Sequence, residues 1–406
     1  MDFQFHTLPN GIRLIHLESS SKVAHCGLFV NTGSRDEWQD EHGIAHLIEH
    51  LIFKGTKKRK AFHILSRMED VGGEVNAYTT KEETCIHASF LKEYYDRFLE
   101  LLSDIVFNST FPEKAIETEK EVVLDEINSY KDSPSEQIYD DFEDQVFMNH
   151  PLGRSILGSR ECLPKLTRNQ LFGFITTRYN TNQMVLASVG SISFPKLIKL
   201  FEKNFREMPT RLRDFERKPF DGYKPLQKEV EMNTNQVHIV FGNLAYNLND
   251  ERRMILHLLT NILAGPGMIS RLNLALREKH GYSYNVESNY SPYTDSGIFS
   301  VYFSTDKEYV KRCISLMMKE FEVMKEIRMG DIQLKKAKQQ IIGQLAISVE
   351  NLENQMLSLG KSYLVYGKVD SMETIYKKIE SITSAQLRDV ANEILDKDKL
   401  SSLIFK

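Results

Sequence analysis

The same order of strands and helices occurs twice along this chain of 406 residues. In the first half, alternating apolar residues and turn residues predict strands, and apolar residues at helical spacing predict helices. The predicted elements are a hairpin at 5–17, a strand at 24–30, a helix at 43–54, strand-like residues at 72–90, and helices at 92–106 and 113–130. A unit with this composition of elements buries one face of a sheet under helices.

The second half repeats this order after Thr234. Its predicted elements are a strand at 236–244, helices at 251–263 and 270–280 around a glycine turn at 264–268, strands at 282–290 and 297–305, and two long helices. The repetition predicts a duplicated α+β fold, with each domain a mostly antiparallel sheet packed with helices. We expect domains at 1–208 and 226–406, joined by a linker at 209–225 that is rich in charge and proline.

The run from His42 to His50 is the segment with the clearest chemistry. On a helix, His46 and His50 lie one turn apart on one face, so both imidazoles can reach one tetrahedral cation. Glu49 lies beside them without having to be a ligand, which suits a general base that takes a proton from water. The order H-x-x-E-H is the inverted form of the zincin motif, and it predicts one Zn²⁺ per chain.

His42 extends the histidine ladder by one further turn. His42 and His50 would lie about 12 Å apart along a helix axis, which is too far to share one ion. The pair of His42 and His46 has Ala45 at the position of the base, so the pair of His46 and His50 is favoured. A histidine-rich face that only forms hydrogen bonds is the alternative interpretation of the motif.

A catalytic zinc site needs a third protein ligand and an open position for water. Helix 113–130 offers Glu119 and Glu126, about two turns apart on nearly the same face. Both flank an apolar stripe, where a carboxylate is costly to bury unless it meets a cation or a donor. Spacing alone leaves the choice between them open, because paired acids on a helix are more often solvated.

These motifs together resemble the pitrilysin family of inverted zincins, which includes insulin-degrading enzyme and the mitochondrial processing peptidases. The resemblance implies that Glu126, at the family's distance after the second histidine, completes the metal site. It also implies that Glu119, seven residues earlier, supports the site. The segment GGEVNAYTTKEET is similar to a family strand that binds substrate as an added β-strand, which implicates Asn76 and Ala77.

The resemblance extends into the second half, where Arg277 and Tyr284 match a family pair that binds substrate carbonyls and the developing oxyanion. Larger members of the family fuse two halves of this size into a clamshell. The resemblance therefore implies a homodimer in which Arg277 and Tyr284 of one subunit complete the zinc site of the other.

We therefore expect a zinc-dependent endopeptidase that acts on peptides or unfolded polypeptide segments in a dimeric chamber. The alternative is a non-catalytic scaffold similar to core subunits of respiratory complexes, although such proteins typically lose the metal ligands. A net charge of −4 predicts no nucleic-acid partner, and the basic run 57–60 is interpreted as a solvated loop.

Three further features of composition predict the compartment. The chain contains no apolar run of the roughly 18 residues that a membrane span requires, so we expect no membrane partner. The N-terminus shows no secretory signal pattern. Its four cysteines are far apart and form no C-x-x-C pair, so a reducing cytoplasm is the expected location.

Overall fold

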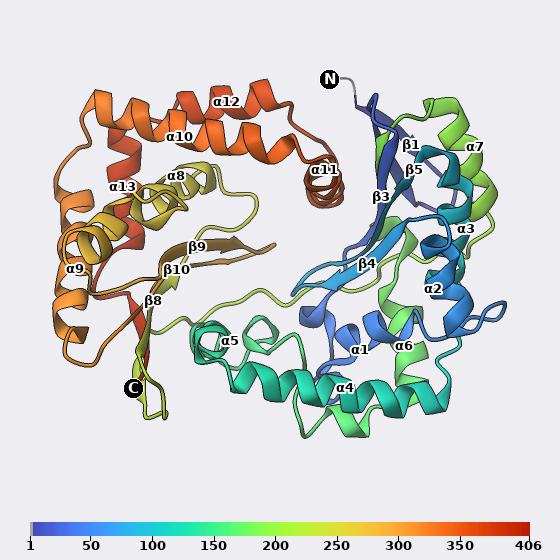
Figure 1. Ribbon diagram of the computed structural model, residues 1–406, viewed down its shortest axis with the longest axis horizontal. Helices are drawn as coiled ribbons and strands as arrows, with labels where there is room; N and C mark the ends of the chain where they lie inside the picture. The colour runs from blue at the N-terminus through green and yellow to red at the C-terminus, as the bar shows by residue number, and fades with distance from the viewer. Residues whose placement is uncertain (1–2) are drawn as a thin grey trace. The chain divides into compact units, whose positions relative to one another are not determined.

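A computed structural model describes residues 3–406 and contains two β-sheets with helices packed on them (Figure 1). The first sheet has the order β1-β2-β6-β3-β5-β4, and only β2 and β6 pair in parallel. Its strands are β1 (Gln4–Thr7), β2 (Arg13–Glu18), β3 (Val23–Val30), β4 (Glu74–Thr79), β5 (Thr84–Leu91) and β6 (Met184–Gly190). The predicted hairpin at 5–17 is present as the antiparallel pair β1 and β2.

The second sheet has the order β7-β11-β8-β10-β9, and only β7 and β11 pair in parallel. Its strands are β7 (Gln227–Val230), β8 (Val237–Leu244), β9 (Val286–Pro292), β10 (Gly297–Thr305) and β11 (Ser401–Phe405). When β1 is left out, the two sheets have the same topology. In each, the first strand in sequence lies at one edge and pairs in parallel with the last strand in sequence. The predicted duplicated α+β fold with mostly antiparallel sheets is therefore confirmed.

Backbone contacts divide the chain into two compact units that are not continuous in sequence. The first unit comprises the chain up to Asn128, Arg154–Arg217 and Ile347–Asp370, and the second comprises Ser129–Gly153, Lys218–Ala346 and Ser371–Lys406. Residues 209–226 between them contain no helix or strand. The domain bounds 1–208 and 226–406, with a linker at 209–225, stay a prediction.

Each unit takes most of its helices from its own half of the chain. The first unit contains α1 (Ile44–Leu51), α2 (Ala61–Glu69), α3 (Tyr95–Phe107), most of α4 (Glu113–Lys131), α6 (Arg168–Arg178), α7 (Phe194–Phe205) and α11 (Leu352–Tyr366). The second contains α5 (Pro134–Val146), α8 (Arg253–Ala264), α9 (Val310–Glu326), most of α10 (Asp331–Val349), α12 (Met372–Glu380) and α13 (Ser384–Ile394). Residues Asn273–Glu278 form a π-helix where a helix was predicted over 270–280.

Two helices are exchanged between the halves, and each packs on a sheet formed by the other half of the sequence. Helix α11, from the second half, packs Met356 and Leu359 on the face of the first sheet that carries Phe29 and Val185. Helix α5, from the first half, packs Phe142 and its apolar neighbours on β8 and β11 of the second sheet. Within residues 3–406, none of the helices has the length and apolar run that crossing a bilayer needs.

Gly360 is the position where α11 comes closest to the first sheet. A Cβ atom added there would lie 2.0 Å from Cε2 of Phe29, so only glycine fits against this ring. We predict that Gly360→Ala lowers the free energy of unfolding by about 1–3 kcal/mol, the usual cost of overpacking a core. Urea denaturation followed by circular dichroism measures this difference.

Gly343 in α10 is the matched control, since nothing lies within 4 Å of a Cβ atom added there. Gly343→Ala is expected to raise the free energy of unfolding by about 0.5–1 kcal/mol, because alanine restricts the unfolded chain and favours the helix. Equal effects of the two substitutions would contradict tight packing of α11 on the sheet.

Candidate metal centre

Helix α1 brings the two histidines of the motif together. The ring centroids of His46 and His50 are 4.7 Å apart, and the rings are inclined at 65°. Their side chains are 13% and 18% exposed, so they lie at a partly open surface of the first unit. Ile44, Leu47, Ile48 and Leu51 on the opposite face are buried, which holds the orientation of the helix.

Helix α4 supplies the carboxylate that faces both imidazoles. Glu126 Oε2 lies 3.8 Å from Nε2 of His46, and Glu126 Oε1 lies 3.8 Å from Nε2 of His50. One ligand atom from each of these three residues lies within 4.8 Å of the others. Zinc bonds of about 2.0–2.1 Å at tetrahedral angles place ligand atoms roughly 3.4 Å apart. Small rotations of the side chains would therefore let the three residues hold one zinc ion.

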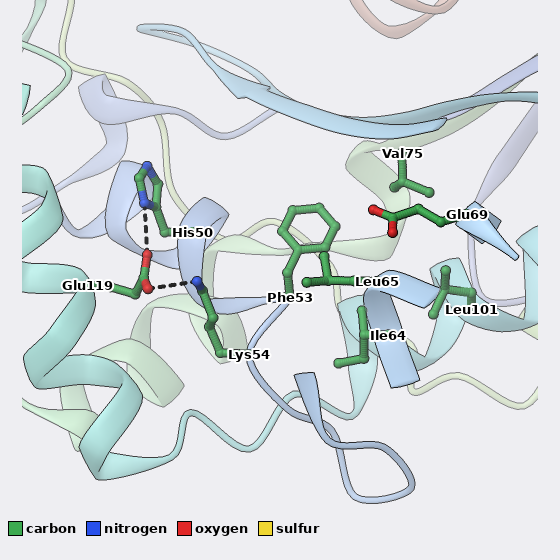
Figure 2. Close-up of a pocket in the computed structure, with 9 residues that line it drawn as sticks. All are labelled: His50, Phe53, Lys54, Ile64, Leu65, Glu69, Val75, Leu101 and Glu119. Carbon is green, nitrogen blue, oxygen red and sulfur yellow. Dashed lines mark hydrogen bonds and ion pairs between the residues drawn. The ribbon is translucent and has the colours of Figure 1, made fainter. Parts of the chain in front are cut away.

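Glu119 has a different environment from Glu126. Its Oε2 lies 3.1 Å from Nδ1 of His50, and its Oε1 forms an ion pair of 2.7 Å with Nζ of Lys54 (Figure 2). Both oxygens are thus engaged, and the side chain is only 7% exposed. By accepting the Nδ1 proton of His50, Glu119 leaves Nε2 of that imidazole free for a metal. These contacts favour Glu126 as the candidate metal ligand and Glu119 as the supporting residue, a choice that spacing alone left open.

Among residues 3–406, no hydrogen-bond partner is present for three buried polar atoms of the centre: Nδ1 of His46, Oε2 of Glu49 and Oε2 of Glu126. Unpaired polar groups are costly in a protein interior, so their presence together fits a centre that receives a cation and water. Burial, aided by the nearby His50, lowers the pKa of His46 to about 4, which keeps this imidazole neutral and able to bind a metal at neutral pH.

Glu49 is the acid of the motif, and its side chain is only partly exposed. Burial raises the pKa of its carboxyl, while the neighbouring Thr79 hydroxyl and His50 reduce that rise. The nearby carboxylate of Glu126 adds to it. A carboxylate with a raised pKa is a stronger base, which is the property required of a group that accepts a proton from water.

The first turn of α1 is held by a carboxylate from outside the helix. Gly43 precedes the helix with φ of +98°, and a Cβ atom there would lie 2.8 Å from Cα of Gly158, so the position requires glycine. The buried Glu37 carboxylate accepts hydrogen bonds from the N–H groups of Gly43 (3.0 Å) and Ala45 (2.9 Å). Glu37 thereby satisfies two donors at the helix N-terminus.

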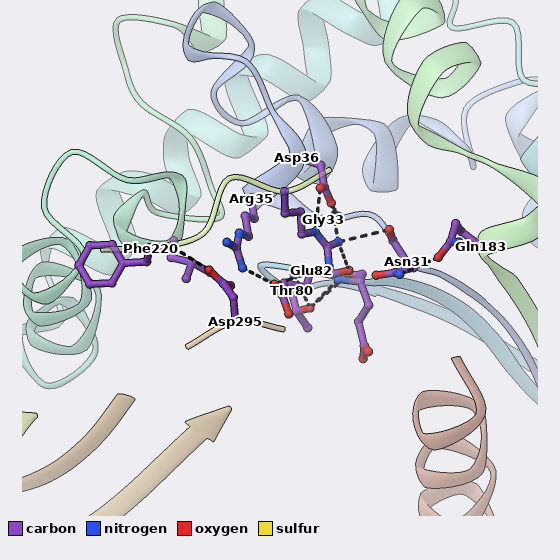
Figure 3. A network of polar contacts seen from close by, with 12 residues as sticks. Asn31, Gly33, Arg35, Asp36, Thr80, Glu82, Gln183, Phe220 and Asp295 are labelled. Atoms are coloured by element: carbon purple, nitrogen blue, oxygen red, sulfur yellow. Dashed lines mark hydrogen bonds and ion pairs between the residues drawn. The ribbon is translucent and has the colours of Figure 1, made fainter. Parts of the chain in front are cut away.

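A buried ionic cluster fixes the loop that carries Glu37. Asp36 accepts hydrogen bonds from Arg213, from Arg217 and from the N–H of Gly33. Figure 3 shows Asp36 with Asn31 and Glu82 in this network, and Glu82 pairs with Arg35 at 2.6 Å. Charges buried this deeply are retained where each is paired and hydrogen-bonded. The loop is therefore a rigid support for α1.

Asn76 and Ala77 lie in β4, the edge strand of the first sheet. They pair with His87 and Ile86 of β5 on one side. On the other side, β4 has no neighbouring strand in the described chain, 3–406. Helix α1 packs beside β4, so the free edge belongs to the surroundings of the centre.

Arg277 and Tyr284 lie together in the second unit and line one cavity of about 410 Å³. Arg277 is in the π-helix, and Tyr284 precedes β9, the edge strand of the second sheet. The Tyr284 side chain is 80% exposed. Neither residue belongs to the unit that contains His46, so their role rests on the resemblance described above.

Comparison with known proteins agrees with this geometry. The family model described as Insulinase (Peptidase family M16) matches residues 14–160, and the Peptidase M16 inactive domain matches residues 165–341. An uncharacterized zinc protease of Bacillus subtilis strain 168, YmxG, is 32% identical over 98% of this chain and 97% of its own length. The chain belongs to peptidase family M16. The predicted resemblance is confirmed.

Other M16 relatives extend over the whole chain in the same way. An uncharacterized zinc protease of Rickettsia bellii is 32% identical over 99% of this chain and 97% of the relative. The fold matches an M16 inactive domain structure from Pseudomonas fluorescens with a TM-score of 0.92, at 20% identity and with 100% and 98% of the two chains covered. A protease from Helicobacter pylori matches with a TM-score of 0.89, at 20% identity over 100% and 99% of the chains.

These matches and the three converging side chains support a zinc metallopeptidase of the M16 family. The two family models also mark a difference between the halves. The helix of the second unit that corresponds to α1 is α8, which contains His257 but no H-x-x-E-H sequence. The second unit therefore does not repeat the histidine pair of α1 in this helix.

Sequence reasoning missed two residues that orient the centre. Lys54 holds Glu119, and Glu37 holds the first turn of α1. Lys54 lies one turn after His50, a spacing that could have suggested a basic partner for an acid near the site. Glu37 carries no such signal, since it lies six residues before Gly43 and outside any capping motif.

Glu37 also makes the stability of the fold depend on pH. Burial raises the pKa of Glu37 from 4.5 to about 8, although the N–H groups of Gly43 and Ala45 oppose this. Between these values the folded chain holds a proton that the unfolded chain has released, so this contribution to stability falls as pH rises. We predict that Glu37→Gln, which cannot ionise, removes that slope between pH 5 and pH 8.

Urea denaturation of metal-free wild type and Glu37→Gln at pH 5, 6.5 and 8 measures the effect. The variant is also expected to lose about 1–3 kcal/mol, because amide and carboxylate differ as acceptors for the two buried N–H groups. Asp40→Asn, at an exposed carboxylate in the next turn, is the control and should keep the wild-type slope. Parallel curves for Glu37→Gln and wild type would show that Glu37 does not titrate in this range.

Proposed function

We propose that this M16 family member is a zinc-dependent endopeptidase that hydrolyses peptides or unfolded polypeptide segments. The observation that carries the proposal is the convergence of His46, His50 and Glu126, with Glu49 beside the two histidines on α1. Two imidazoles and one carboxylate leave a tetrahedral position open, which is the ligand set of a catalytic rather than a structural zinc site.

When bound, zinc supplies Lewis acidity that polarises a peptide carbonyl and lowers the pKa of a coordinated water to about 7. Glu49 acts as the general base in this mechanism: its carboxylate accepts a proton from the attacking water and later donates that proton to the nitrogen of the leaving amine. Glu119 keeps His50 in the tautomer that presents Nε2, and Lys54 keeps Glu119 in place.

Substrate would bind as an additional strand along β4. An edge strand offers unpaired N–H and C=O groups, and these favour an extended peptide over a folded one. Asn76 and Ala77 would supply part of that pairing, and the closeness of β4 to α1 supports a scissile bond near the metal. Because backbone groups provide most of the affinity, sequence preference would come from side-chain pockets.

Arg277 and Tyr284 would act at the zinc centre of a second copy of the chain. The proposal is a homodimer in which Arg277 and Tyr284 of the partner subunit hydrogen-bond substrate carbonyls and the developing oxyanion at each zinc centre. Their shared cavity and the exposure of Tyr284 support a role in contacting a ligand. A phenol and a guanidinium are suitable donors for this purpose.

The alternative function, a non-catalytic scaffold, predicts that one or more metal ligands are missing. Here all five residues that the resemblance implicates around the metal are present, namely His46, Glu49, His50, Glu119 and Glu126. Four of them form contacts or a cluster with one another. This arrangement favours the peptidase, and zinc content together with chelator-sensitive cleavage separates the two functions.

A cytoplasmic location is part of the proposal. The four cysteines are free, and Cys26, Cys85 and Cys313 are buried. Buried thiols without disulfides suit a reducing compartment.

The base and the metal ligand can be separated by two substitutions. We predict that Glu49→Gln retains one zinc ion per chain but lowers turnover about 10²–10⁴-fold, the usual contribution of a general base. Glu126→Gln is expected to lose zinc as well as turnover, because a neutral amide is a poor zinc ligand. Zinc is measured by elemental analysis, and turnover with an internally quenched peptide.

Glu121→Gln is the control for Glu126→Gln, because Glu121 lies on the same helix with an exposed side chain outside the cluster. It should keep both zinc and activity. Normal turnover by Glu49→Gln would exclude Glu49 as the base, and full zinc content in Glu126→Gln would exclude Glu126 as the ligand.

Mixed dimers test whether the site is shared. Glu49→Gln and Tyr284→Phe subunits, each impaired alone, are joined in a dimer purified through two different affinity tags. One of its two sites then combines Glu49 of one subunit with Tyr284 of the partner subunit, so about half of the wild-type activity should return. Absence of recovery in verified mixed dimers would argue against sharing between subunits.

A further inference from the structure

A pocket of about 220 Å³ opens beside the metal centre in the first unit. His50 and Glu119 line it at one end, so any group bound there lies next to the reacting bond. The wall consists of five apolar side chains: Phe53, Ile64, Leu65, Val75 and Leu101. Val75 comes from β4, the strand proposed to pair with substrate. A side chain of a substrate held along β4 can therefore enter this pocket.

The two ends of the pocket differ in charge. Lys54 and Glu119 at the His50 end neutralise each other through their ion pair of 2.7 Å. In Figure 2, Phe53 and Leu65 lie between this pair and Glu69. Glu69 comes from the last turn of α2 and is exposed, and its carboxylate has no ion-pair or hydrogen-bond partner among residues 3–406. The far end of the pocket therefore presents one uncompensated negative charge.

We infer that Glu69 determines the specificity of this pocket and selects a substrate residue with a long apolar stem and a cationic end, that is, lysine or arginine, beside the scissile bond. The aliphatic stem of such a side chain packs on the apolar wall while its charged group reaches the solvent-exposed rim. A norleucine side chain has the same kind of stem but no charge to meet Glu69. An acidic side chain would meet a like charge there. The inference rests on the proposed peptidase function.

The test uses the zinc-loaded full chain and internally quenched peptides that differ at one residue next to the cleaved bond, which mass spectrometry locates. Lysine, norleucine and glutamate are compared on either side of that bond. For wild type, kcat/KM for lysine is expected to exceed that for norleucine about two- to fivefold, the range of a partly exposed ion pair. Raising the salt concentration should reduce this ratio.

Glu69→Gln should bring the lysine to norleucine ratio close to one, because the lysine peptide loses its ion pair. Glu69→Lys should reverse the selectivity and favour glutamate. Glu93→Gln is the matched control: it removes the same charge from an exposed position that does not line the pocket, and it should keep the wild-type ratio. Zinc content and circular dichroism establish that the variants are folded.

The outcomes separate this inference from the proposed function. If wild type cleaves the peptides but Glu69→Gln leaves the lysine to norleucine ratio unchanged, Glu69 does not select the substrate although the peptidase function stands. A wild-type preference for norleucine would also overturn the inference. If zinc-loaded wild type cleaves no peptide of the set, the proposed function fails, and the inference fails with it.

Discussion

The buried Glu37 carboxylate and the first turn of α1 form the contact on which the rest of the centre depends. Two N–H groups at the start of the helix, from Gly43 and Ala45, end on this one side chain. The two histidines project from the next turns, so a change in the start of the helix would move both imidazoles relative to Glu126. The paired charges around Asp36 keep the Glu37 loop in place. Rigid support of this kind is what a metal site requires of its surroundings.

Three glutamates close to one another have different chemistry because their surroundings differ. Glu119 is buried between His50 and Lys54, which stabilise its negative charge and occupy both oxygens. Glu126 faces the imidazoles of His46 and His50 and is 41% exposed, so it is free to bind a cation. Glu49 has little solvation and no cationic partner as close as that of Glu119, and its raised pKa is the result. The position of each carboxyl group relative to nearby charges and solvent, rather than the residue type, therefore determines its chemical role.

The sequence was informative where structure is local and uninformative where it depends on distant contacts. Periodicity predicted α1, and repetition predicted two sheets of the same class, because both signals come from neighbouring residues. The contacts of Glu119 with Lys54, and of Asp36 with Arg217, join segments that are far apart in the chain. The helical spacing of Lys54 after His50 could suggest a basic partner near the site, but periodicity does not identify Glu119 or Arg217 as the partner. The π form of residues 273–278 was not visible either, since its apolar spacing resembles that of an ordinary helix.

The exchange of helices was invisible for a related reason. An amphipathic pattern shows that one face of a helix is buried, but it does not show which sheet covers that face. Helix α11 follows the last strands and helices of its own sequence half, yet Met356 and Leu359 pack on Phe29 and Val185 of the first sheet. Sequence order would have assigned this helix to the second unit.

This exchange also sets an order for folding during synthesis. The apolar face of the first sheet is complete once β6 has been made, but α11 leaves the ribosome more than a hundred residues later. At about 5–20 residues per second, that delay is on the order of ten seconds. Throughout it, the side of the sheet with Phe29, Val185 and Val189 lacks its cover. The nascent chain must therefore be protected from aggregation at a face that the finished protein hides.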